Sequence, residues 1–126
     1  MDHQWRDNQP IYRQLRDQIA ALVIDESLGD GDALPSVREV AAEYQVNPLT
    51  VLKGYQLLVD EGLVESRRGR GMFVIKGARA RLLKLLRAQF IADEWPQIVQ
   101  TVERLGLDWD ELLSYARNNT KGDENV

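Results

Sequence analysis

The sequence predicts a mainly α-helical protein with one small β-hairpin. Three observations support this prediction. Apolar residues recur every three or four positions over most of the 126 residues, as they do on one face of a helix. Two segments begin with sequences that are typical helix caps. Near residues 63–75 the pattern changes to that of two short strands separated by glycines.

The first helix is predicted to begin at Pro10 and to end in the acidic segment 25–31. Asn8 is a candidate N-cap, and proline suits the first turn of a helix. Gly29 and Gly31 interrupt the acidic segment and favour a loop there. The apolar face of this helix comprises Ile11, Leu15, Ile19, Leu22 and Val23.

Two further helices are predicted on either side of a tight connection. Ser36 and Glu39 have the spacing of a capping box, so the second helix is expected to begin at Ser36 and to be short. Asn47 followed by Pro48 combines a good N-cap with a proline at the first helical position, which predicts the start of a third helix. The buried face of that third helix comprises Val51, Tyr55 and Leu58.

A short hairpin is predicted after the third helix. Gly62 is the expected left-handed residue at the end of that helix. Residues 63–66 and 72–75 have the pattern of strands, and residues 67–71 form the turn between them. Two helices around a tight turn, followed by a hairpin, predict an N-terminal winged helix-turn-helix domain.

Residues 78–118 are predicted to form a short all-α C-terminal region. Pro96 forces a break or a new helix start, and Gly106 ends the helix that follows. Asp108 and Glu111 repeat the capping-box spacing before the last helix. The predicted organisation is a winged helix-turn-helix domain at 1–76, a helical region at 77–118 and a flexible tail at 119–126.

The C-terminal helices are too apolar to be a solvated appendage. A region of this length buries little core alone, so a second copy of the chain is the expected cover. Trp5, Trp95 and Trp109 fit the interior of such a dimer, although a small-molecule pocket would use the same residue type. No effector site is recognisable in this region. The residues predicted for dimerisation are Leu82, Leu86, Phe90, Trp95, Val102, Leu105 and Leu112.

Composition argues against most kinds of enzyme. The chain has no cysteine, and its one histidine, His3, lies near the start, so thiol chemistry, a positioned imidazole and a multi-histidine metal site are not expected. No glycine-rich phosphate loop follows a strand. We therefore expect no enzymatic activity, no metal and no cofactor. No apolar run reaches the length of a membrane span and the first residues do not resemble a signal peptide, so a cytoplasmic location is expected.

Charge is distributed unevenly along the chain. The net charge is −4, but residues 66–92 contain no acidic residue. A basic stripe on an acidic protein can bind phosphate, although a solvated helix face would have the same composition. Three arginines of the stripe lie on the hairpin turn, where they repel one another unless an anion is near. The basic residues of the stripe are Arg67, Arg68, Arg70, Lys76, Arg79, Arg81, Lys84 and Arg87.

The predicted third helix corresponds to the recognition helix of a helix-turn-helix protein, which places its first turn in the major groove of DNA. Thr50 can hydrogen-bond a base edge, and Lys53 can reach a phosphate or a guanine. Leu49 offers only an apolar contact, for example to a thymine methyl group. The hairpin arginines can reach the DNA backbone or the minor groove. Ser36 and Asn47 are also fully explained as helix caps.

Several short motifs occur in order between residues 8 and 76. They are Pro10-Ile11-Tyr12, Leu34-Pro35-Ser36 with Arg38, Val46-Asn47-Pro48-Leu49-Thr50-Val51, Glu61-Gly62-Leu63-Val64, and Gly69-x-Gly71 with Phe73-Val74. In this order they resemble the winged helix-turn-helix domain of the GntR superfamily of bacterial transcription regulators. The short helical remainder resembles the YtrA branch, in which the C-terminal piece serves mainly for dimerisation.

The resemblance also implies which positions contact DNA. Pro48 and Leu49 replace the arginine or other polar residue of many members, which would shift specificity to Arg38, Lys53 and the hairpin. An ion pair between Arg38 and an acidic neighbour such as Glu39 is the alternative use of that arginine. The positions that match family contacts are Arg38 on the second helix, Asn47 and Thr50 on the third, and Arg68 and Gly69 at the hairpin tip.

The sequence therefore predicts a dimeric transcription repressor that binds a two-fold related operator in double-stranded DNA. The resemblance implies that its targets are its own operon and an adjacent transporter. The alternative is a winged-helix module that binds another protein without reading DNA. The residues predicted to contact DNA are Ser36, Arg38, Asn47, Leu49, Thr50, Lys53, Arg67, Arg68, Gly69 and Arg70.

Overall fold

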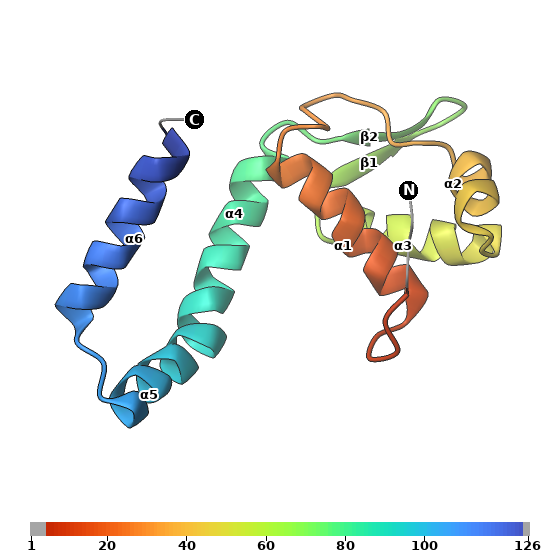
Figure 1. Ribbon diagram of the computed structural model, residues 1–126. Coiled ribbons are helices and arrows are strands. Elements are labelled where there is room, and N and C mark those ends of the chain that lie inside the picture. The colour runs from red at the N-terminus through yellow and green to blue at the C-terminus, as the bar shows by residue number, and fades with distance from the viewer. Residues whose placement is uncertain (1–4, 125–126) are drawn as a thin grey trace. The chain divides into compact units, whose positions relative to one another are not determined.

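The computed structural model describes residues 5–124, so His3 lies outside the described residues. The chain forms two compact units that divide after Leu85. The first unit contains α1 (Ile11–Ile24), α2 (Val37–Tyr44), α3 (Pro48–Asp60), the antiparallel strands β1 (Val64–Arg67) and β2 (Gly71–Val74), and most of α4 (Ala78–Gln89) (Figure 1). The second contains the end of α4, the π-helical turn η1 (Phe90–Glu94), α5 (Trp95–Leu105) and α6 (Trp109–Glu124). The predicted class, mainly α-helical with one hairpin, is confirmed.

The beginnings of α2 and α3 confirm the capping predictions. Ser36 Oγ accepts a hydrogen bond from the Glu39 backbone N–H at 3.1 Å, and Asn47 Oδ1 accepts one from the Leu49 N–H at 2.8 Å. Each bond satisfies a backbone donor that has no partner inside the helix. Between the two helices the chain turns at Gln45, whose φ of +55° lies in the left-handed region.

The beginning of α1 differs from the prediction. Pro10, and not Asn8, is the N-cap residue, and it contributes no side-chain hydrogen bond. The buried amide of Gln14 acts instead on the preceding segment. It accepts from the Arg6 N–H and donates to the carbonyl groups of Arg6 and Gln9, each at 2.8 Å. A side chain inside the helix therefore holds the residues before it in place.

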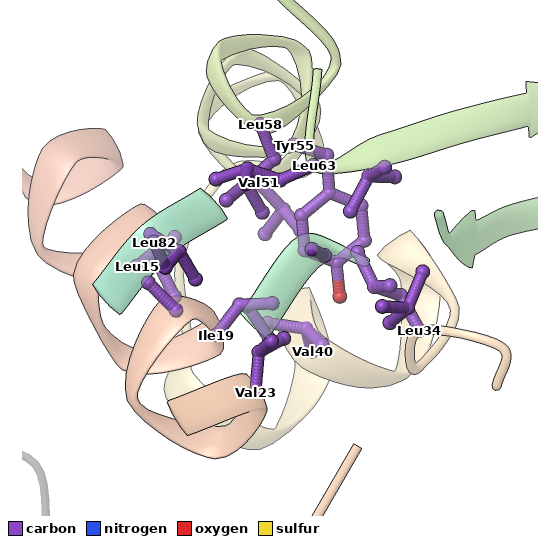
Figure 2. Close-up of a cluster of buried hydrophobic side chains, with 14 of the residues drawn as sticks. Leu15, Ile19, Val23, Leu34, Val40, Val51, Tyr55, Leu58, Leu63 and Leu82 are labelled. Carbon is purple, nitrogen blue, oxygen red and sulfur yellow. The ribbon is translucent and has the colours of Figure 1, made fainter. Parts of the chain in front are cut away.

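The core of the first unit is centred on α3 (Figure 2). Val51 and Leu58 are 0% exposed and Tyr55 is 2% exposed, which confirms the predicted buried face. Helix α1 lies very close to this face. A Cβ atom added at Gly54 would stand only 2.8 Å from the Tyr12 carbonyl oxygen of α1. The absence of a side chain at this position allows the two helices to pack so closely.

The end of α3 and the hairpin also follow the predicted pattern. Gly62 has a φ of +76°, and the Leu63 N–H donates to the Leu58 carbonyl at 3.0 Å, as expected for a left-handed helix ending. In the hairpin, Val64 pairs with Val74 and Arg67 pairs with Gly71. Residues 31–34 run along the other edge of β2, where the Leu34 N–H donates to the Met72 carbonyl at 2.8 Å. The hairpin is thereby attached to the body of the unit.

Helix α4 contributes to the core of the first unit, which corrects one prediction. Ala78 and Leu82 are each 1% exposed and belong to the same buried cluster as the core residues of α1 and α3. Leu82 therefore moves from the expected dimerisation surface to this core. The first compact unit likewise extends beyond the expected boundary at residue 76, because the first turns of α4 pack into it.

The second unit is a run of helical segments. The expected break or new start at Pro96 takes the form of the π-helical turn η1, after which α5 begins with Pro96 in its first turn. Gly106, at φ +65°, ends α5 as predicted. Helix α6 then continues to Glu124, through residues 119–124 that the sequence suggested as part of a tail.

Candidate DNA-binding surface

A groove of about 370 Å³ lies between the hairpin tip and the beginning of α2. Its walls include Ser36 from the α2 cap and the arginines Arg67, Arg68 and Arg70 from the hairpin. These residues are far apart in the sequence, and the fold brings them together. In Figure 1 the hairpin tip, α2 and the beginning of α3 lie at the same end of this unit. The three predicted contact segments therefore occupy one region of its surface.

The three hairpin arginines have different surroundings. Arg67 Nη2 lies 3.0 Å from Glu65 Oε1, and its guanidinium carbon stands 4.2 Å from the centre of the Phe73 ring. Arg67 is thus held against the strands. Arg68 and Arg70 are exposed and have no ion-pair partner within the described part of the chain. The hairpin tip therefore presents two uncompensated positive charges beside the groove.

The first turn of α3 is open to solvent. Asn47, Pro48 and Leu49 are exposed, and Thr50 is half-buried. Part of the Asn47 side chain is already used, because its oxygen caps the helix. The backbone N–H groups at this helix end favour a nearby negative charge. The turn is therefore accessible to a partner such as DNA, and one of its exposed residues is the apolar Leu49.

Lys53, one turn further along α3, is oriented by an aromatic ring. Its Nζ atom lies 4.2 Å from the centre of the Tyr12 ring on α1. A cation over an aromatic face is attracted by the negative charge of the π system. Sequence reasoning did not find this contact, because no local pattern indicates that Tyr12 and Lys53 meet. The ring holds the ammonium group at the seam between α1 and α3.

Arg38 lies in the first turn of α2, close to the cap at Ser36. Its side chain is exposed, and among residues 5–124 it forms no ion pair with Glu39 or Glu43. The alternative in which an acidic neighbour engages Arg38 is therefore not observed. Within the described residues, the exposed guanidinium group therefore remains available to an external partner.

Two internal contacts hold the elements of this surface together. The Tyr55 hydroxyl donates to the Pro35 carbonyl at 2.8 Å, which joins α3 to the residue before the α2 cap. Burial raises the pKa of Tyr55 above its ordinary value, so the hydroxyl remains a donor even in mildly alkaline solution. Arg16 on α1 forms ion pairs with Asp17 and with Glu61 at the end of α3. Both α2 and α1 are thereby fixed to α3.

The structure divides the basic stripe into parts with different roles. Arg79 donates to the Ile24 carbonyl at the end of α1 at 2.8 Å, and its Nε lies 3.8 Å from a carboxylate oxygen of Glu26. This arginine therefore serves an internal contact with the acidic loop after α1. Arg68 and Arg70 at the hairpin tip have no such ion pair among the described residues, a difference that the uniform composition of the stripe did not reveal.

Within residues 5–124, no group of three or more histidine or acidic side chains is arranged to hold a metal ion. In the same part of the chain, no helix combines the length and the apolarity needed to cross a bilayer.

Comparisons with known proteins agree with this geometry. The family model described as bacterial regulatory proteins, gntR family, matches residues 11–74. The HTH-type transcriptional regulator YhcF of Bacillus subtilis is 35% identical over 122 residues, which cover 97% of this chain and 99% of YhcF. The HTH-type transcriptional repressor YtrA of the same organism is 34% identical over 112 residues, covering 89% of this chain and 85% of YtrA.

A solved structure agrees over both units. The structure of a transcriptional regulator of the GntR family from Bacteroides thetaiotaomicron is similar with a TM-score of 0.74, at 26% identity, over 90% of this chain and 98% of that protein. The family and the two relatives are described as regulators and not as enzymes. The chain therefore belongs to the GntR family of bacterial regulatory proteins, in its YtrA branch, and is a DNA-binding transcription regulator.

Proposed function

We propose that the chain is a repressor that binds a two-fold related operator as a homodimer. The observation that carries this proposal is the groove, which joins the beginning of α2 to the unpaired charges of the hairpin tip. The proposed DNA-contacting residues are Ser36, Arg38, Asn47, Leu49, Thr50, Lys53, Arg67, Arg68, Gly69 and Arg70.

Each part of this surface has a distinct task in the proposed complex. The first turn of α3 enters the major groove, as in other helix-turn-helix proteins. Arg68 and Arg70 reach phosphates or the adjacent minor groove, where positive charge is favoured. Arg67 supports the hairpin through Glu65 and approaches DNA only with its outer edge.

The second unit supplies the proposed dimer interface. The rings of Trp95 and Trp109 lie 5.6 Å apart between centres, and Phe90 stands 6.3 Å from Trp95, yet all three remain substantially exposed. A soluble monomer rarely leaves so many large apolar side chains in water, so a second copy is the expected cover. The residues proposed for this interface are Leu86, Phe90, Trp95, Leu105, Leu112 and Val102, of which Val102 is already buried.

A DNA titration at several salt concentrations tests the proposal. The full-length protein is titrated with DNA from upstream of its own gene, which also tests control of its own operon and of an adjacent transporter. Each phosphate that the protein neutralises adds a slope of about −0.9 to the plot of log K against log salt. Binding that does not change with salt would contradict the proposed role of the hairpin.

A charge reversal distinguishes this function from a protein-interaction module. Arg68→Glu with Arg70→Glu should abolish binding to the operator at physiological salt. Lys84→Glu with Arg87→Glu is the matched control, because it changes the net charge by the same amount on α4. Equal losses in the two double variants would show that only total charge matters, and no loss in either would favour a protein partner.

A further inference from the structure

The outward face of α3 changes in character along the helix. The core uses Val51, Tyr55 and Leu58, which leaves the opposite side of the helix to solvent. The exposed stripe is apolar at its beginning and becomes polar towards its end, where Gln56 donates to Asp60 at 3.2 Å. The residues of this stripe, in order, are Leu49, Leu52, Lys53, Gln56 and Asp60.

Leu49 dominates the end of the stripe that faces DNA in the proposed complex. Its side chain is 71% exposed, so it contributes little apolar burial to the stability of the fold. Its neighbours offer few hydrogen-bonding groups to a base. Asn47 uses its oxygen for capping, Thr50 is half-buried, and Lys53 is held over the Tyr12 ring.

We propose that Leu49 contributes to operator specificity, beside Arg38, Lys53 and the hairpin, by an apolar contact with the C5 methyl group of a thymine. This inference rests on the proposed function. A leucine side chain can neither donate nor accept a hydrogen bond, so it cannot read the polar edges of the bases. The thymine methyl is the apolar group that base pairs present in the major groove, and apolar side chains contact it there.

Leu52 extends the same apolar patch by one turn of the helix. It is three residues after Leu49 and 43% exposed, so the two leucines are neighbours on one face. The patch is bordered by Lys53, whose charge can meet a phosphate next to the thymine. In a two-fold complex each half-site then contains one thymine whose methyl group is read by Leu49.

Replacement of thymine by uracil tests this proposal directly, because uracil lacks only the C5 methyl group. The bound segment upstream of the gene is first defined by footprinting. Synthetic duplexes then carry uracil at one symmetry-related pair of thymines at a time, and affinities are measured by fluorescence anisotropy at constant salt. The proteins compared are the natural chain, Leu49→Ala and the conservative variant Leu49→Met.

We expect one pair of thymines at which uracil weakens the natural protein about fourfold per half-site, the effect of one unburied methyl group. Leu49→Ala should bind the thymine and uracil duplexes equally, whereas Leu49→Met should keep the sensitivity. Since Leu49 is exposed, thermal melting of Leu49→Ala should match that of the natural chain.

Two results would overturn the inference while leaving the proposed function intact. One is salt-dependent operator binding with no uracil-sensitive pair. The other is a sensitivity that persists unchanged in Leu49→Ala. Failure of the natural protein to bind any upstream DNA would instead reject both the proposed function and this inference.

Discussion

The two units of the chain use their apolar residues differently. Fifteen side chains of the first unit form one buried cluster. Among the described side chains of the second unit, Val102 is the one buried apolar side chain, while Ile91 and Leu105 are 60% and 64% exposed. Because burial of apolar surface is the main favourable contribution to folding, the first unit contains its own source of stability. The second leaves large apolar side chains exposed, and the proposed dimer interface would cover them.

This contrast predicts which substitutions should change the stability of the fold and which should change the association between copies. Substitutions in the cluster of the first unit should change the free energy of unfolding. Substitutions on the exposed apolar surface of the second should change the affinity between copies. Substitutions at the proposed DNA surface should change neither of these quantities and should alter DNA affinity alone.

The largest expected effect is that of Leu58→Ala. Leu58 is 0% exposed at the centre of the cluster, so its truncation leaves a cavity that should cost about 2–5 kcal/mol of unfolding free energy. Urea denaturation measures this loss. Leu52→Ala on the same helix is the matched control and should change stability by less than about 0.5 kcal/mol. Similar losses of unfolding free energy in the two variants would contradict the description of Leu58 as buried and Leu52 as exposed.

The second prediction compares the same substitution at one exposed leucine in each unit. Leu105→Asp should weaken self-association by about 3 kcal/mol, because a dimer interface would bury an unpaired carboxylate. Leu49→Asp carries the same change at a similarly exposed leucine of the first unit, where it should leave association unchanged and prevent DNA binding. Sedimentation velocity measures association. If Leu105→Asp associates like the natural chain, the proposed interface is wrong.

The third prediction concerns operator binding by the first unit and has a smaller expected effect. Arg38→Ala should weaken operator binding by about 1–3 kcal/mol while leaving unfolding and association unchanged. Anisotropy titration measures the binding, and Arg87→Ala on α4 serves as the control. Operator affinity that is unaffected by Arg38→Ala would remove this residue from the contact surface.

The smallest effect concerns the link between α3 and α2. Tyr55→Phe removes the hydrogen bond to the Pro35 carbonyl and should cost about 1 kcal/mol at neutral pH. Burial raises the pKa of Tyr55 in the folded state, so above about pH 10 the unfolded state loses the phenolic proton first and stability falls. This alkaline loss should be smaller in Tyr55→Phe. Urea denaturation at neutral and alkaline pH measures this loss. If the natural chain and Tyr55→Phe lose the same unfolding free energy between the two pH values, Tyr55 is not the group responsible.

Local signals explain what the sequence predicted correctly. The caps at Ser36 and Asn47, the left-handed Gly62 and the helix end at Gly106 depend on interactions within a few positions, and all four predictions are confirmed. The buried face of α3 follows from helical periodicity alone. The cap at Asn8 was wrong because a competing side chain, that of Gln14, organises the same segment.

Contacts between distant segments could not be predicted in the same way. The burial of Leu82 depends on where α4 packs, which periodicity does not specify. The groove beside Ser36 and the ring beneath Lys53 likewise require the tertiary fold. For the DNA surface, the sequence therefore indicated which residues to consider, and the structure added which charges are compensated internally.

The close approach at Gly54 has a consequence for how such a regulator can evolve. Position 54 on the inner side of α3 leaves no room for a side chain, because one added carbon atom would stand 2.8 Å from the Tyr12 carbonyl oxygen of α1. The outer positions Leu49, Leu52 and Gln56 carry no comparable constraint. If the proposed DNA-binding mode holds, substitutions at these outer positions would change the target genes of a duplicated copy and leave the packing of α3 against α1 intact.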